Sequence, residues 1–343
     1  MSILVTGGLG YIGSHTVVEL VQSKYDQIII VDNLQNTTKD IFDKIKTISG
    51  SYEKNMVFIE LDIVDKRSLQ TEVFDKYNID AIIHFASLKS VSKSIEYPLE
   101  YYHKNITGAL NLLFMCKQYH VNHFIFSSSA TVYGSAKSPF CESDQIGIGI
   151  TNPYGHTKYM IEQILADVSK TGLTTICLRY FNPVGAHSSG LLGENLQGTP
   201  SNLMPYLVKV AMQNNTEHYF GPEYDALTIF GQDYSTVDGT CERDFIHVVD
   251  LAKGHVAVLD KLSQLEGKHH AFNLGTGMPT TVLHVVKTFE EVNHVKIPVV
   301  FSDRRQGDVQ TSYCNHEYTF EKINWKTEKS LRDICIDAWR KHL

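Results

Sequence analysis

Short apolar runs and longer amphipathic segments alternate along the first half of the chain, which predicts an α/β fold with a doubly wound parallel sheet. Two local features support this class: a glycine-rich turn follows the first apolar run, and an aspartate ends the second. The expected strands cover residues 3–6, 28–32, 57–61, 81–85, 124–128 and 175–180. Helical patterns near 11–22, 38–48, 66–77, 98–119 and 153–171 separate them.

The residue composition and the pattern of apolar residues change after Asn182. Residues 183–245 are rich in Gly, Pro, Asn and Asp and carry one helical stretch near 202–213, which is typical of loops that cover a ligand. Regular patterning returns near 248–262. We therefore expect a dinucleotide-binding domain over 1–182 and a smaller α/β substrate domain over 183–343. The ligand cleft would lie between them, and some later segments could return to the first domain.

Composition narrows the class of function. The net charge of −7 lacks the basic field of a nucleic-acid or membrane-surface protein, so we expect neither partner. No apolar stretch reaches the roughly 18 residues of a membrane span, and the chain has no basic leader, which predicts a cytoplasmic protein. Six scattered cysteines without a CxxC pair indicate a reducing compartment. We expect no metal site, and we place His269-His270 on a polar loop.

A GxGxxG pattern runs from Gly8 to Gly13, after the first strand and at the start of the first helix. Glycines there let backbone N–H groups approach a pyrophosphate at a helix N-terminus. Asp32 ends the second strand, where its carboxylate can accept a hydrogen bond from a free ribose hydroxyl and would repel a 2′-phosphate. The sequence therefore predicts a Rossmann-type domain that binds NAD in preference to NADP.

Polar residues also end the third, fourth and fifth strands. Asp62 could contact the adenine amino group or cap the helix that starts near residue 65. Lys89 could reach a phosphate or hydroxyl, or lie solvated in its loop. Serine capping of a turn accounts for Ser127, whereas we expect Ser129 to contact a reacting hydroxyl.

Tyr154 and Lys158 stand four residues apart, which puts both side chains on one face of a helix. Pro153 supports a helix start at this point, with Asn152 as its cap. The lysine cation, with a nicotinamide ring nearby, would lower the phenol pKa from about 10 toward neutrality. The pair therefore predicts a tyrosine base, and we expect Ser129, Tyr154 and Lys158 to be the catalytic residues.

With these motifs the chain resembles the extended short-chain dehydrogenase/reductase superfamily and, within it, the UDP-glucose 4-epimerases. The resemblance runs essentially end to end. The motifs at 6–13 and 152–158 are superfamily-wide, whereas the segments 180–187 and 238–247 are much more specific.

The resemblance implies a reaction. Tyr154, assisted by Ser129, would take the proton of the sugar 4-hydroxyl while hydride passes from C4 to NAD. The 4-keto sugar then presents its other face, and the hydride returns there. UDP-galactose and UDP-glucose would interconvert without net redox change, so NAD would stay bound. A homodimer through the helices near 98–119 and 153–171 is also implied, although packing on the sheet accounts equally for their apolar faces.

The resemblance also implies site residues. Arg243 and Arg305 would bind the diphosphate and Asp308 the ribose, whereas Arg304 is expected to be a surface charge. The implied cofactor-binding residues are Gly7, Gly10, Tyr11, Ile12, Gly13, Asp32, Asn33, Asn36, Asp62, Ile63, Phe85, Ala86, Lys89, Asn105, Ser127, Tyr154, Lys158 and Tyr180. The implied substrate-binding residues are Lys89, Ser129, Tyr154, Phe181, Asn182, Asn202, Leu203, Arg243, Arg305, Asp308 and Ser312.

Other functions on the same fold are disfavoured by particular residues. A nucleotide-sugar 4,6-dehydratase needs an acid pair where this chain has Ala130-Thr131. A simple reductase would release its cofactor and often prefers NADP, which Asp32 disfavours. A catalytically silent NAD sensor or scaffold, or another nucleotide-sugar epimerase, is the alternative to the implied reaction.

Two positions depart from the family pattern. Ser312 stands where the family has either a bulky tyrosine or a small residue, and a small residue leaves room for a 2-acetamido group. We therefore hypothesise that UDP-GlcNAc and UDP-GalNAc also interconvert. The stretch 214–225 is longer than in compact bacterial members and predicts an extended surface loop.

Overall fold

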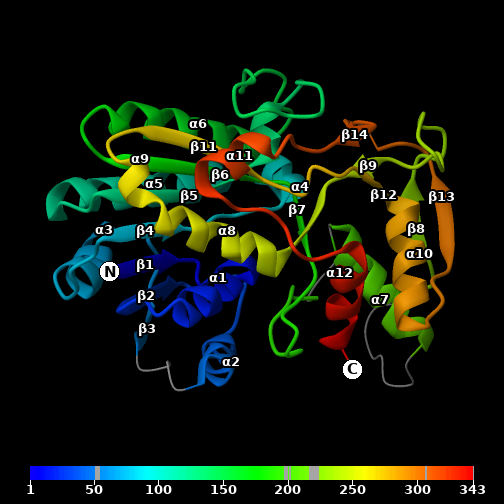
Figure 1. Ribbon diagram of the computed structural model, residues 1–343, viewed down its shortest axis with the longest axis horizontal. Helices are drawn as coiled ribbons and strands as arrows, with labels where there is room; N and C mark the ends of the chain where they lie inside the picture. The colour runs from blue at the N-terminus through cyan, green and yellow to red at the C-terminus, as the bar shows by residue number, and fades with distance from the viewer. Residues whose placement is uncertain (51–54, 197–199, 201, 216–223, 306, 343) are drawn as a thin grey trace.

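The computed structural model describes residues 1–50, 55–196, 200, 202–215, 224–305 and 307–342. Its largest element is a seven-stranded sheet in which all neighbouring strands are parallel, in the order β11-β6-β5-β4-β1-β2-β3 (Figure 1). This confirms the predicted α/β class. The strands are β1 (Ser2–Thr6), β2 (Gln27–Asp32), β3 (Met56–Glu60), β4 (Ala81–His84), β5 (His123–Ser129), β6 (Thr174–Tyr180) and β11 (His269–Leu274).

Helices cover both faces of this sheet. One hydrophobic core joins it to α1 (Tyr11–Gln22), α2 (Asp40–Ser49) and α8 (Val248–Asp260). A second core joins it to α3 (Lys66–Leu69), α5 (Pro98–Tyr119) and α6 (Pro153–Ser169). Because both faces are buried, the central residues of β2 are continuously apolar instead of alternating, and Ile28–Val31 are all buried.

The sheet includes a strand from the second half of the chain. β11 pairs with β6 in parallel, with Asn273 opposite Arg179, and α8 packs against α1 (Figure 1). The chain therefore crosses back to the sheet after residue 247.

The rest of the second half forms small sheets and a third core around α7, α10 and α12, on the right of Figure 1. The strands of these small sheets pair in the orders β10-β7, β12-β9-β14 and β13-β8. The helices around this core are α7 (Leu203–Asn215), α10 (Val282–Asn293) and α12 (Leu331–Arg340). α9 (Leu262–Leu265) and α11 (Glu317–Ile323) instead join the core that contains α1 and α8, and α4 (Val91–Glu96) lies in the first half. The short strands are β7 (Asn182–Val184), β8 (Leu227–Phe230), β9 (Glu242–Arg243), β10 (Phe245–His247), β12 (Thr280–Thr281), β13 (Val299–Ser302) and β14 (Thr311–Ser312).

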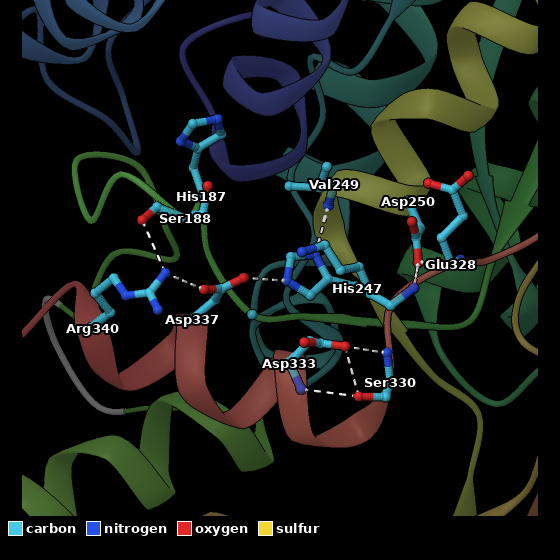
Figure 2. A network of polar contacts seen from close by, with 12 residues as sticks. His187, Ser188, His247, Val249, Asp250, Glu328, Ser330, Asp333, Asp337 and Arg340 are labelled. Atoms are coloured by element: carbon cyan, nitrogen blue, oxygen red, sulfur yellow. Dashed lines mark hydrogen bonds and ion pairs between the residues drawn. The ribbon is translucent and has the colours of Figure 1, made fainter. Parts of the chain in front are cut away.

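A polar network ties α12 to the start of α8, as Figure 2 shows. His247 Nδ1 accepts a hydrogen bond from Val249 N at 3.1 Å, so its proton sits on Nε2, which lies 3.3 Å from Asp337 Oδ2. Asp337 also pairs with Arg340 at 2.8 Å, and Arg340 donates to Ser188 O at 3.0 Å. α12 thereby connects the third core to a helix that packs on the large sheet.

Three local predictions were wrong or incomplete. His269 and His270 begin β11, because the sheet edge continues to this point, and they do not lie on a loop. The helical pattern at 66–77 is a short α3 followed by a π-helical turn at 70–74. Of the predicted loop at 214–225, residues 216–223 lie outside the described residues.

None of the helices in the described residues combines the length and the apolar character needed to cross a membrane. Within the same residues, no group of three or more His, Cys, Asp or Glu could hold a metal ion.

Candidate active site

The glycine turn brings the N-terminus of α1 close to the end of β4. A Cβ on Gly13 would lie 2.2 Å from Gly7 O, and a Cβ on Gly7 would lie 2.6 Å from Ala86 N, so neither position admits a side chain. At Gly10 an added Cβ would meet Gly7 O at 3.2 Å and nothing closer. No described side chain caps α1, whose first N–H groups are therefore available to an anion. This arrangement fits the pyrophosphate of NAD.

Asp32 braces this turn from the end of β2. Its carboxylate accepts hydrogen bonds from Leu9 N at 3.1 Å and Leu34 N at 3.0 Å. Burial raises the pKa of this carboxyl above its ordinary value, and the backbone N–H groups oppose the shift. The side chain thus lies against the loop that would face the adenosine ribose.

Three residues expected to bind the cofactor, Asn33, Asn36 and Asp62, follow the ends of β2 and β3. Asn33 donates to Asp62 Oδ2 at 3.0 Å, while Asp62 Oδ1 accepts from Val64 N at 3.0 Å. Asn36 is exposed on the same loop. Asp62 does not cap α3, as one interpretation required; Asp65 does, because its carboxylate is the one that accepts from the first helical N–H groups. The cap interpretation of Asp62 is therefore wrong, and its contact with the cofactor stays a prediction.

The loop after β4 is held from two sides. Phe85 N and Ala86 N both donate to Thr6 O, at 2.9 and 3.0 Å. Buried Asn105 accepts from Leu88 N at 2.8 Å and donates to Leu88 O and to Thr157 Oγ1, both at 3.1 Å. Asn105 was expected to bind the cofactor, and the structure places its amide between this loop and α6.

Lys89 and Tyr11 lie at the outer edge of the site. The Lys89 ammonium is exposed, 3.2 Å from Glu194 Oε1 and 5.9 Å from the Tyr11 ring centroid. The Tyr11 hydroxyl donates to Gly185 O at 2.7 Å. Both residues therefore connect the glycine turn to the segment after Asn182.

The predicted catalytic residues meet where β5 ends and α6 begins. Asn152 Oδ1 accepts from Gly155 N at 2.8 Å, and Pro153 occupies the first turn, so the predicted cap is confirmed. Ser129 is hydrogen-bonded to Tyr154. One turn on, buried Lys158 donates to Ser127 O at 2.6 Å and to Ser87 Oγ at 3.2 Å.

The protein groups alone do not produce the lowered phenol pKa that we expected. Burial raises the pKa of Tyr154 to about 12, and the hydrogen bond from Ser129 only partly offsets this. Burial also lowers the pKa of Lys158 to about 7. The ammonium lies 5.7 Å from the phenol ring centroid, and for both groups removal from water is the largest cause of the pKa shift. We expected two positive charges, on Lys158 and on the nicotinamide ring, to lower the phenol pKa of Tyr154. The second of these charges is the one that the protein does not itself supply.

Tyr180 and Phe181 line the sheet side of this group. The Tyr180 hydroxyl lies 2.5 Å from His255 Nε2 and next to Ser127. Phe181 is buried against Tyr133 and Phe140. They lead directly into Asn182, the first residue of β7.

A second group of predicted residues gathers around β9. Arg243 donates to Glu242 O at 2.8 Å and to Val309 O at 2.9 Å, and its Nη2 lies 3.5 Å from Asp308 Oδ1. Ser312 is opposite Arg243 in the parallel pairing of β14 with β9. These contacts place a cation, an acid and a small residue at one sheet edge.

The two neighbouring arginines differ. The Arg305 guanidinium stacks 3.9 Å from the Phe230 ring centroid. Arg304 pairs with Asp233 at 2.8 Å and covers the ring of Tyr234, as a surface charge would. Asn202 is exposed immediately before α7, which begins at Leu203.

Asp244 connects the two groups and was missed by sequence reasoning. Its backbone accepts from Asn182 N and donates to Ser312 O, both at 3.0 Å. Its buried carboxylate accepts from Thr276 N at 2.7 Å and Gly277 N at 3.0 Å. A lone acid next to Arg243 gave no signal of this role, because the partners lie 32 or more residues away.

The comparisons with known proteins agree with this geometry. A model of the NAD dependent epimerase/dehydratase family matches residues 3–275. The UDP-glucose 4-epimerase of Bacillus subtilis (strain 168) is 45% identical over 343 residues, covering 99% of this chain and 96% of that protein.

Solved structures are similar over the same length. A UDP-glucose-4-epimerase from Stenotrophomonas maltophila, with bound NAD and formylated UDP-arabinopyranose, has a TM-score of 0.92 at 40% identity and covers 99% of this chain and 97% of its own. The UDP-Glc/GlcNAc 4-epimerase of Campylobacter jejuni has a TM-score of 0.81 at 34% identity, with coverage of 100% and 99%.

Proposed function

The chain belongs to the NAD dependent epimerase/dehydratase family, and from this premise we propose how its residues divide the work of the reaction. The protein is an NAD-dependent isomerase that interconverts UDP-galactose and UDP-glucose. The observation that carries the proposal is the meeting of Ser129, Tyr154 and Lys158 where β5 ends and α6 begins. The alternative of a silent sensor is set aside.

NAD is the cofactor, and when bound it would supply reversible hydride transfer at the sugar C4. We propose that the first-turn N–H groups of α1 hold its pyrophosphate. Asp32, Asn33 and Asp62 would bind the adenosine, with Lys89 reaching the inner ribose or phosphate if it leaves Glu194. The fit of the uncapped helix end and the glycine turn supports this assignment.

We propose that Tyr154 takes the proton of the sugar 4-hydroxyl and later gives it back. Ser129 is hydrogen-bonded to the phenol and would share that proton with the sugar. Lys158 is fixed by Ser127 O and Ser87 Oγ, so its charge stays beside the phenol as the proton moves. The three residues keep the proton within one small group.

The nucleotide must stay anchored while the sugar presents its second face. We propose that Arg243 and Arg305 bind the diphosphate and that Asp308 binds the ribose. Arg243 is suited to this role because two backbone carbonyls fix its guanidinium before any ligand arrives. Asn182, Asn202 and the Phe181 backbone region would contact the sugar side.

We propose that 2-acetamido sugars are also substrates. Ser312 is half-buried beside Arg243, and a relative of similar fold bears the name UDP-Glc/GlcNAc 4-epimerase. Turnover of UDP-GlcNAc and UDP-GalNAc beside the unsubstituted pair decides the question. Absence of measurable acetamido turnover by the wild type would remove this proposal.

A homodimer through α5 and α6 is also proposed. These helices pack against each other, yet Leu99 is 83% exposed and Phe114 54% exposed, so packing on the sheet does not use their whole apolar surface. Light scattering on wild type and on Phe114→Glu tests this, with a shift to monomer expected.

We further propose a cytoplasmic location, consistent with six free cysteines, and domains at 1–182 for NAD and 183–343 for the UDP-sugar.

One experiment tests the central proposal. Purified protein is incubated with UDP-galactose without added NAD, and UDP-glucose is measured together with the NAD released on denaturation. Conversion with about one NAD per chain is expected. Failure to convert even with NAD supplied would overturn the assigned roles.

A further inference from the structure

A row of polar side chains crosses the buried sheet directly beneath the catalytic residues. Ser128 on β5, Arg179 on β6 and Asn273 on β11 are register partners on three adjacent strands. All three are at most 3% exposed, and Leu178, Tyr180, Phe272 and Leu274 flank Arg179 and Asn273 along their strands. Polar groups at the centre of a covered parallel sheet are costly unless each finds a partner.

Glu162 of α6 supplies the partner for the charge. It forms a two-point ion pair with Arg179, at 2.8 Å to Nη2 and 3.2 Å to Nε. The same carboxylate accepts a hydrogen bond from the Ser128 hydroxyl. The side chains of this ion pair are 4% and 1% exposed, so the pair is sealed from water.

The row is closed on its other side by Tyr133. Its hydroxyl accepts from Arg179 Nη1 at 3.0 Å and donates to Asn273 Oδ1 at 2.6 Å. The Asn273 amide then donates to Phe140 O at 3.0 Å. The donors and acceptors of the row are thus satisfied by protein groups, as a buried network requires.

Two members of the row, Ser128 and Arg179, and their partner Glu162 lie close in sequence to residues of the site. Ser128 precedes Ser129, Arg179 precedes Tyr180, and Glu162 lies one turn beyond Lys158. Two successive turns of α6 therefore bind two successive residues of β5, because Lys158 donates to Ser127 O and Glu162 accepts from Ser128. The end of β5 has no freedom to move against α6 while both contacts hold.

We propose that Glu162, held by Arg179, is a positioning residue for epimerisation: it fixes the end of β5 against α6 and so keeps Ser129 and Lys158 in place around Tyr154. This inference rests on the roles proposed above for those three residues. Glu162 acts through them and does not touch the sugar.

The charges around Lys158 support the same role. Glu162 and Tyr154 face it from α6, Ser87 from the loop after β4, His84 from β4, and Cys177 and Arg179 from β6. Burial lowers the pKa of His84 to about 3 and raises that of Cys177 well above its ordinary value, so both are neutral. Cys177 and Glu162 both oppose the lowering of the pKa of Lys158 by burial, and because the thiol is neutral, Glu162 is the one of the two that carries a negative charge.

The test is Glu162→Gln, which keeps the side-chain shape. If the substitution displaces the catalytic residues, kcat for UDP-galactose should fall by up to about 100-fold. KM should stay within about 2-fold of the wild-type value, and the NAD content should not change. Because the neutral amide no longer raises the pKa of Lys158, the alkaline limb of the kcat profile should move to lower pH. A merely structural residue would not move that limb.

The matched control is Asp337→Asn. Asp337 is another buried carboxylate, paired with His247 and Arg340 on α12 (Figure 2). It should lower the melting temperature while leaving the pH profile unchanged. Equal displacement of the limb by both variants would overturn the proposal, since the cause would then be general destabilisation.

If Glu162→Gln does not fold, the double variant Glu162→Gln/Arg179→Met replaces it, because removing both charges leaves no unpaired ion. The same fall in kcat and the same displaced limb are expected. A folded variant with wild-type kcat and pH profile would overturn the inference. Wild type without UDP-galactose turnover would instead overturn the proposed roles themselves.

Discussion

The half of the site proposed to face NAD and the half proposed to face the UDP-sugar are built differently. In the first, the polar groups end the strands of one continuous sheet, and Lys158 is 2% exposed with both its contacts inside the protein. In the second, Arg243 lies on a two-residue strand, and Arg305 and Asp308 are exposed on a loop. A rigid sheet suits the transfer of a proton and a hydride, whereas short strands and loops suit a ligand that enters, turns and leaves.

Because the two halves differ in this way, substitutions in them should change different properties of the enzyme. Changes in the NAD-facing half should reduce turnover or stability, because its geometry is fixed before the ligand binds. Changes in the UDP-facing half should reduce affinity, because its residues hold parts of the substrate that do not react.

Tyr154→Phe should have the largest effect. It removes the phenol and keeps the ring, so NAD content should match the wild type while kcat for UDP-galactose falls by about 10² to 10⁴. Tyr25→Phe is the control, since its hydroxyl bonds exposed Asp260 at 3.1 Å. Full activity of Tyr154→Phe would refute the placing of the chemistry in this half.

Arg243→Leu should raise KM for UDP-galactose by about 10- to 100-fold with kcat nearly unchanged, because a charge-assisted hydrogen bond contributes about 1.5–3 kcal/mol. Steady-state kinetics measure this. Arg304→Leu is the matched variant, since Arg304 pairs outward with Asp233, and its KM should stay within about 3-fold. A fall in kcat for Arg243→Leu with unchanged KM would break the contrast.

Gly13→Ala should destabilise the NAD-facing half by about 1–3 kcal/mol, because the new Cβ lies 2.2 Å from a backbone oxygen that cannot yield. Thermal unfolding and the NAD retained on purification measure the loss. Gly10→Ala, where the nearest atom is at 3.2 Å, should cost less than about 1 kcal/mol. Equal losses at the two glycines would mean that close packing does not set the turn.

Ser312→Tyr should have the most selective effect. It fills the volume proposed for the 2-acetamido group, so kcat/KM for UDP-GalNAc should fall by about 10-fold or more while that for UDP-galactose stays within about 3-fold. Ser312→Ala should change neither value appreciably. Parallel loss of both activities would show that position 312 supports the anchor and does not select the sugar.

The same contrast explains what the sequence could predict. The strand ends and the Asn152 cap were predictable because they depend on residues close in sequence, and the helix at 98–119 was predicted with the bounds of α5. The roles of Asp244 and of the row through Arg179 were not, because their partners come from distant segments. The predicted loop at His269-His270 was wrong because nothing in this polar dipeptide indicates that it forms a strand beside β6.

β11 is synthesised well after β6, the strand with which it pairs, and this delay affects the nascent chain. β6, whose residues are all buried in the finished protein, is an open edge until residue 274 has left the ribosome. At about 5–20 residues per second, that edge waits for seconds. An apolar edge strand is a template for pairing with other chains, so the nascent protein needs shielding during this interval. A chain terminated near residue 182 should accumulate as aggregate, however complete its NAD motifs are.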